Sequence, residues 1–233
     1  MSDTLYLSLW YPNLRLAAMA DKLTAVLSAF AAHGGEARVY SATVWPVSWS
    51  ESPVLQHVYG RRSDAAGERG AEPRAAVDEV LELLHDDYAY EFQIGWSLWE
   101  LERGSEKAGP SISSAAIPVA VATSTEDDSV VIGPRWVREP RLVRVTAYGP
   151  LFDDGAYESD GHIRIDFGPD GPFLEEGVEL DSVAARHVEE NVRQLIELTT
   201  AVEKASGATA RLLWSELGES LAQRLAARLG VAN

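Results

Sequence analysis

The sequence predicts an α+β protein whose mostly antiparallel strands form one or two sheets, with helices packed on one face. The decisive segment spans residues 88–101, where side chains alternate between the two sides of one long strand. One side carries only large groups, namely Tyr88, Tyr90, Phe92, Ile94, Trp96 and Leu98. The other side carries Ala89, Glu91, Gln93, Gly95, Ser97 and Trp99. The first side predicts a sheet that closes a core, while the second either lines a groove or faces water.

Strand and helix periodicities alternate through the first part of the chain. The predicted elements are, in order, a strand at 4–11, a helix at 16–30, strands at 37–45 and 54–59, a helix beginning at Pro73 and the strand at 88–101. This order is that of ferredoxin-like sandwiches. Residues 1–102 are therefore expected to form a ferredoxin-like α+β half. Because that superfold hosts many activities, it indicates no function.

The second part of the chain is expected to begin after a polar loop at residues 103–114. Residues 115–233 predict a β-meander followed by two helices. The strands are expected at 116–123, 130–132, 142–148 and 162–167. Asp181 is a typical N-cap for the first helix, and leucines recur every fourth residue from Leu213 to Leu229 in the second. The two parts form either two domains or one continuous domain.

Composition narrows the classes of partner. The chain of 233 residues carries 20 Lys+Arg against 36 Asp+Glu, a formal net charge of −16. A field of this sign repels nucleic-acid phosphates and anionic lipid, so we expect neither nucleic-acid nor membrane binding. It favours a basic protein partner or a cationic ligand, although acidic composition also simply promotes solubility.

Several cofactors and locations are disfavoured by the sequence. The absence of cysteine excludes disulfides, zinc–thiolate sites and iron–sulfur clusters, and we expect no cofactor and no metal site. The first residues lack the features of a signal peptide, and no window approaches the ~20 apolar residues of a membrane span. We expect a soluble, cytoplasmic protein.

Two late strands place polar residues together. His162, Arg164 and Asp166 share one side of their strand, while Arg144 and Tyr148 share one side of another. If these strands are neighbours, their common face could bind an anion or transfer a proton. A solvent-facing antiparallel sheet with cross-strand ion pairs has the same composition, so that alternative stays open.

The tryptophans suggest a contact surface. Trp45 and Trp49 flank a short segment that contains Pro46, an arrangement that is difficult to bury completely. We therefore interpret this pair as a recognition edge, with a tryptophan-rich core as the alternative.

Three functional hypotheses remain. The first, which we favour, is a non-enzymatic binding protein, such as an acidic antitoxin or immunity-type partner of a basic protein. The second is a small-ligand-binding protein with an aromatic pocket, in which Glu91 and Gln93 of the 88–101 strand make polar contacts. The third is a hydrolase or isomerase that uses His162 and Asp166 as an acid/base pair. The candidate binding residues are Trp45, Trp49, Glu91, Gln93, Arg144, Tyr148, His162 and Arg164.

Overall fold

One seven-stranded antiparallel sheet organises the part of the chain that the structure describes. This structure is a computed structural model, and it describes residues 3–33, 38–60, 70–102, 135–175, 180–217 and 223–224. The strands are β1 (Thr4–Trp10), β2 (Val39–Pro46), β3 (Leu55–Val58), β4 (Tyr88–Glu102), β5 (Arg135–Tyr148), β6 (Ile163–Pro169) and β7 (Ala210–Ser215). The helices are α1 (Leu16–His33), α2 (Pro73–Leu81), α3 (Tyr157–Asp160), α4 (Gly171–Leu174) and α5 (Ser182–Ser206), with a 3₁₀ turn η1 (Phe152–Asp154).

The order of strands joins the two predicted parts of the chain. It runs β3-β2-β4-β5-β6-β1-β7, and β4 pairs with β5 from Ala89–Tyr148 to Glu102–Arg135. The predicted α+β class and antiparallel sheet are confirmed. The element order of the first part is also observed, but β1 lies between β6 and β7 and does not pair with β2, β3 or β4. The ferredoxin-like arrangement of residues 1–102 is therefore not confirmed.

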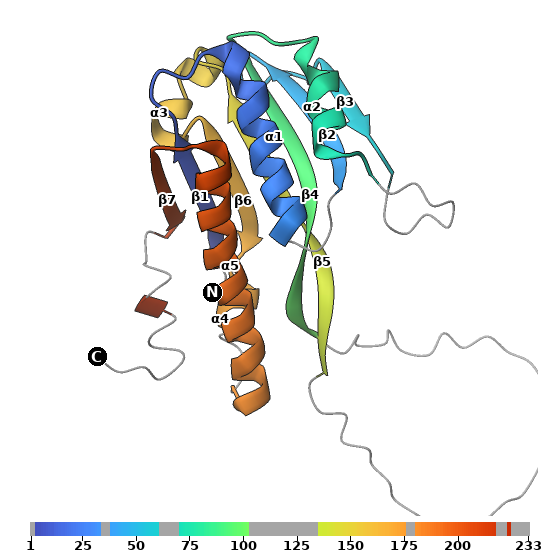
Figure 1. Ribbon diagram of the computed structural model, residues 1–233, viewed down its shortest axis with the longest axis vertical. Coiled ribbons are helices and arrows are strands. Elements are labelled where there is room, and N and C mark those ends of the chain that lie inside the picture. Colours follow the sequence, from blue (N-terminus) through green and yellow to red (C-terminus); the bar gives the residue numbers. More distant parts are fainter. Residues whose placement is uncertain are drawn as a thin grey trace, which may run out of the picture.

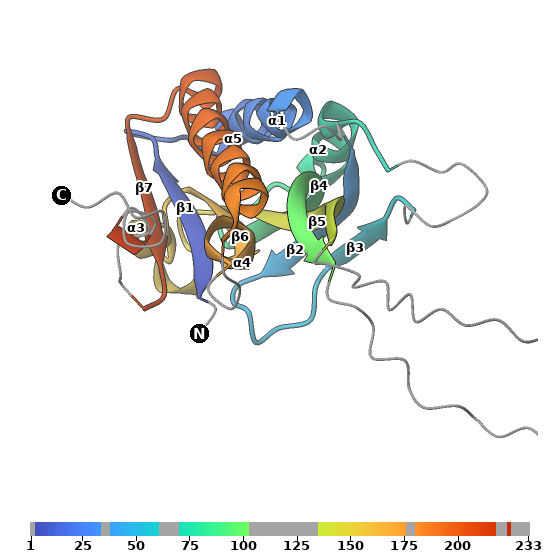
Figure 2. The ribbon, with the colours of Figure 1, turned by 90° about the horizontal axis from the view of Figure 1, so that it is seen from below.

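Helices α1, α2 and α5 cover one side of the sheet (Figures 1 and 2). The core lies beneath them and contains the buried side of the 88–98 alternation, as predicted. Trp96 is its largest buried residue, and its ring contacts Phe167 at 5.3 Å and Phe173 at 5.8 Å between ring centroids. Burial of such rings supplies the main driving force for the helices to pack on this face. Within the described ranges, no helix has the length and apolarity to cross a membrane.

Helix α5 is held in place at its start, its middle and its end. The Asp181 side chain accepts hydrogen bonds from Val183 N and Ala184 N, which confirms the predicted N-cap. Gly207 ends the helix with φ at +68°, a conformation that glycine adopts without steric cost. Midway, the fully buried Asn191 exchanges hydrogen bonds with the backbone of Trp99 and donates another to Pro172 O, all at 2.8–2.9 Å.

Two elements differ from their predictions. Residues 210–215 form strand β7, which pairs with β1, rather than the start of a helix. Backbone groups on the otherwise unpaired edge of β1 favour a strand here, and these long-range pairings override the local leucine spacing. Strand β5 begins at Arg135, earlier than residue 142, because its charged first half pairs with the end of β4. The strands predicted at 116–123 and 130–132, and most of the second predicted helix, lie outside the described residues.

The far end of the β4–β5 hairpin turns toward α5. Strict alternation assigns Trp99 to the same side as Glu91. In the structure, the Trp99 ring instead lies 4.2 Å from the His187 imidazole of α5, and Trp136 lies 5.3 Å from it. Two-stranded ribbons twist more strongly than wide sheets, so the twist carries Trp99 around to the helix.

Replacing Asn191 with alanine tests the attachment of α5 to the hairpin. The change leaves the backbone N–H and C=O of Trp99 and the carbonyl of Pro172 without their partner. We expect the free energy of unfolding to fall by about 2–4 kcal/mol in urea denaturation. The control is Glu197→Ala, at an exposed position of the same helix, which should change it by less than about 0.5 kcal/mol. Equal stability of the two variants would contradict this account.

Candidate functional site

Polar residues from both parts of the chain meet on the helix-free side of the sheet. In the register, Gln93 of β4 lies opposite Arg144 of β5, which lies opposite Asp166 of β6. One step along, Glu91 lies opposite Thr146, which lies opposite Arg164. The sequence left open whether the strands that carry these residues are neighbours. The structure shows that β5 pairs with both β4 and β6.

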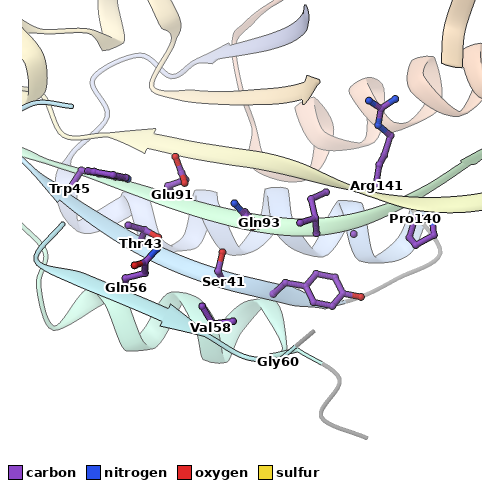
Figure 3. Close-up of a pocket in the computed structure, with 13 residues that line it drawn as sticks. Ser41, Thr43, Trp45, Gln56, Val58, Gly60, Glu91, Gln93, Pro140 and Arg141 are labelled. Atoms are coloured by element: carbon purple, nitrogen blue, oxygen red, sulfur yellow. The ribbon is translucent and has the colours of Figure 1, made fainter. Parts of the chain in front are cut away.

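A groove of about 550 Å³ crosses this side of the sheet over β3, β2, β4 and β5. Its lining residues are Tyr40, Ser41, Thr43, Trp45, Gln56, Val58, Gly60, Glu91, Gln93, Gly95, Pro140, Arg141 and Leu142. Figure 3 shows side chains of β2, β3 and β4 standing on their strands while helices pass behind the sheet. A smaller hollow of about 150 Å³, which includes Arg144 and Asp166, shares Gln93 and Leu142 with the groove.

Neutral hydrogen-bonding groups dominate the polar lining of the groove. Ser41 and Thr43 contribute hydroxyls, and Gln56 and Gln93 contribute amides. Arg141 also borders the groove, but its side chain points away from Gln93 (Figure 3). Its Nη1 lies 3.5 Å from the Glu100 carboxylate. The amides and hydroxyls are therefore the groups that a polar ligand would meet along most of the floor.

Glu91 is the carboxylate on the floor of this groove. Its side chain is 12% exposed, and its Oε2 lies 3.6 Å from Arg144 Nε. Burial raises the pKa of Glu91 above its ordinary value, and this effect outweighs the opposing attraction of Arg144. A carboxylate in this environment is a stronger base than an exposed one and retains acceptor capacity for a ligand.

Aromatic rings and one guanidinium cover much of the remaining helix-free side. This aromatic belt consists of Trp214, Tyr6, Arg164, Tyr148, Trp49 and Trp45. Its neighbours are 4.6–6.2 Å apart, and Arg164 lies over the Tyr6 ring on one side and the Tyr148 ring on the other. An ion pair with Asp160 holds Arg164 in this position. The belt covers the sheet surface over β7, β1, β6 and the end of β5. The groove lies beside it, over β3, β2, β4 and the earlier part of β5.

The predicted recognition edge is partly packed. Trp49 remains 37% exposed, but its ring also contacts Phe152 at 5.1 Å and Trp45 at 5.6 Å. Trp45 joins the groove to the belt, since it belongs to both. The two tryptophans thus have different surroundings, and Trp45 is the one that borders the groove.

His162 and Asp166 lie in different environments. Asp166 lies 3.9 Å from Arg144 and accepts a hydrogen bond from Gly168 N. His162 borders a separate pocket of about 310 Å³, where its Nδ1 accepts a hydrogen bond from Tyr11 N and burial lowers its pKa. A separation of four residues along a strand corresponds to about 13 Å. A direct hydrogen bond between the two side chains, as an acid/base pair would use, is not formed.

The structure brings together some of the residues singled out by sequence and adds others. Trp45, Glu91 and Gln93 share the groove, Arg144 borders the adjoining hollow, and the belt contains Trp49, Tyr148 and Arg164. The sequence interpretation missed Ser41, Thr43 and Gln56 as lining residues. Alternation in the predicted strand 37–45 carried the signal for the first two, because it places them on the side of Trp45. Gln56 had no comparable signal, since its strand is short and weakly patterned.

Comparisons with known proteins do not identify the site. No family model, curated protein or solved structure matches the chain. Among the residues that the structure describes, no group of three or more His, Cys, Asp or Glu side chains is arranged to hold a metal ion. The functional argument therefore starts from the side chains of the groove.

Replacing Glu91 with glutamine tests whether the buried, ionised carboxylate lowers the stability of the fold. Because burial raises the folded-state pKa, the folded protein binds a proton at Glu91 more tightly than the unfolded chain does. Stability is therefore lost as pH rises through that pKa. We expect Glu91→Gln to raise the melting temperature at pH 7.5, with a difference that narrows as the pH falls through the Glu91 pKa.

The control for this measurement is Glu139→Gln, which removes the same charge at an exposed position of β5. It should leave the melting temperature nearly unchanged across the pH range. A Glu91→Gln variant that melts below the wild type at pH 7.5 would show that the carboxylate stabilises the fold, contrary to this account.

Proposed function

We propose that this chain is a small-ligand-binding protein and that its ligand occupies the groove over β3, β2, β4 and β5. The observation that carries the proposal is a groove of about 550 Å³ with the largely buried Glu91 on its floor. Small-molecule sites typically enclose about 300–1,000 Å³ and combine apolar walls with a few polar groups that fix orientation. This groove combines Trp45, Val58 and Leu142 with amides, hydroxyls and one carboxylate.

The loss of folding stability caused by burying the Glu91 carboxylate supports the same proposal. A buried carboxylate that lowers stability is expected at sites that bind ligands or perform chemistry, where stability is often sacrificed for function. The belt covers much of the remaining helix-free side, while the groove leaves Gln93 and Ser41 accessible to a ligand. Of the three hypotheses drawn from the sequence, the small-ligand-binding protein with Glu91 and Gln93 as polar contacts therefore agrees best with the geometry.

A variant in which a large side chain fills the groove tests the proposed small-ligand binding. In Ser41→Trp, a bulky ring is placed on the floor of the groove from a half-buried position of β2. We expect small metabolites from a diverse library to raise the melting temperature of the wild type and to have little effect on this variant. At a concentration of about 100 times the dissociation constant, the stabilisation is about 2.7 kcal/mol.

The matched control is Ser28→Trp, at an exposed position of α1 on the opposite side of the sheet. It should respond to ligands as the wild type does. The proposal fails if no compound stabilises the wild type, or if every stabilising compound acts equally on Ser41→Trp.

A basic protein partner is the second candidate function. Three exposed apolar side chains favour it, namely Val47, Trp49 and Leu151, which are 56%, 37% and 63% exposed. Their loops are linked, since Asp153 N donates a hydrogen bond to Val47 O. Exposed apolar side chains on two linked loops, on a chain of charge −16, fit a partner with an apolar contact and a positive surface.

The double variant Val47→Asp/Leu151→Asp tests this candidate, because both positions are exposed and neither belongs to the core. Affinity capture from the native organism should recover a basic protein with the wild type and at least about tenfold less of it with the variant. Recovery of the same proteins in equal amounts by both chains would reject a partner at this edge.

A further inference from the structure

The Glu91 carboxylate has acceptor capacity that the described residues do not use. Glu91 lies opposite Thr43 on β2 and opposite Thr146 on β5. Its closest charged neighbour, Arg144, is 3.6 Å away, and no described residue donates a hydrogen bond to its oxygens. An ionised carboxylate offers about four acceptor positions. A ligand that donates N–H groups would satisfy positions that this groove leaves open.

The charges around Glu91 leave the floor of the groove negative. Arg144 lies between two carboxylates, at 3.6 Å from Glu91 and 3.9 Å from Asp166. Arg164 of β6 also attracts the Glu91 carboxylate, but Arg164 forms an ion pair with Asp160. With the acids ionised, the charges of Glu91, Asp166, Asp160, Arg144 and Arg164 sum to one negative charge. Arg144 is also half exposed, so water weakens its attraction for Glu91. The chain as a whole carries a net charge of −16, which reinforces the same sign.

Trp45 provides the second contact that a cation uses. Trp45 follows Thr43 by two residues on β2, so it is diagonal to Glu91, a spacing of about 7–8 Å in an antiparallel pair. Figure 3 shows the two side chains next to each other at one end of the groove. Trp45 lines the groove, and its indole Nε1 is buried without a partner among the described residues. A cation can lie within about 6 Å of such a ring and still contact a carboxylate on its other side.

We infer that the groove binds an organic cation, with an ammonium or guanidinium group seated between the Glu91 carboxylate and the Trp45 ring. This inference rests on the proposed function and names the ligand class of the same site. The remainder of the ligand meets the Ser41 hydroxyl and the Gln93 and Gln56 amides, so it carries hydroxyl or amide groups. Burial raises the pKa of Glu91, and a bound cation would reverse this effect by favouring the ionised carboxylate.

Matched probes separate charge from shape. One set consists of glucosamine, glucose and glucuronate, and a second consists of ethanolamine, ethylene glycol and glycolate, which all carry a hydroxyl. We measure their affinities by calorimetry at pH 7.5, and rank the compounds of the metabolite library that bind in the groove by charge. We expect the groove-binding compounds to be cations, each at least about tenfold tighter than its neutral or anionic counterpart.

Variants of the full chain test the two contacts. Glu91→Gln should weaken binding of the cation by about tenfold to a hundredfold, because it removes a charged hydrogen-bond acceptor of the same shape. Glu139→Gln, the charge-matched control, should leave the affinity unchanged. Trp45→Leu should weaken binding severalfold while Trp45→Phe retains most of it. In the wild type, affinity should fall as the pH is lowered through the Glu91 pKa, and Glu91→Gln should lack this dependence.

The failures of the inference and of the proposed function are distinguishable. If Ser41→Trp abolishes binding but the groove-binding compounds are neutral or anionic, the cation inference is overturned and the small-ligand function stands. The inference is equally overturned if Glu91→Gln binds the cation as tightly as the wild type does. If no compound of any charge binds in the groove, both are overturned.

Discussion

The pairing of β4 with β5 is the constraint on which the rest of the structure depends. β4 belongs to the first part of the chain and β5 to the second, and their register runs without interruption from Ala89–Tyr148 to Glu102–Arg135. This pairing places β4 in the interior of the sheet, between β2 and β5. Glu91 is therefore flanked on both sides by strands and is withdrawn from water, which an edge position would not achieve.

The same pairing determines which side of the sheet remains available. Helices α1, α2 and α5 bury the apolar sides of the strands, so the polar sides of β2, β4, β5 and β6 form one surface (Figure 2). Over β5, β6, β1 and β7, the aromatic belt and the turn around Phe152 cover this surface. Over β3, β2, β4 and residues 140–142 of β5, the strands' own side chains form this surface, and the groove lies there. A ligand site thus arises where the sheet lacks a second layer.

Local periodicity predicts the faces of individual strands well, but it does not predict their neighbours. The alternation of residues 88–98 correctly separates Trp96, which is fully buried, from Glu91 and Gln93, which border the groove. The N-cap at Asp181 is equally local and is also confirmed. The position of β1 between β6 and β7 depends on long-range pairing, and no spacing within residues 4–11 encodes it. The leucine spacing from Leu213 is misleading for a similar reason, because pairing with β1 decides the conformation of 210–215.

Geometry also separates residues that share a face in the sequence. His162 and Asp166 both alternate to the polar side, yet Asp166 pairs with Arg144 while His162 lines a pocket with Tyr11. Periodicity predicts the side of the strand on which a residue lies, but it does not predict which residues of other elements surround it. The twist of the hairpin adds a further difference, since it carries Trp99 from the predicted polar side to His187. Side-chain partners of this kind become visible only when the register and twist are known.

The most direct test of this account is the titration of the Glu91 side-chain carboxyl by ¹³C NMR, assigned with the Glu91→Gln variant. The account predicts a pKa above the ordinary value of 4.5 in the free protein, because burial outweighs the attraction of Arg144. It also predicts that saturation with a groove-binding amine lowers this pKa. A Glu91 pKa at or below 4.5 in the free protein, unchanged by the amine, would contradict the account.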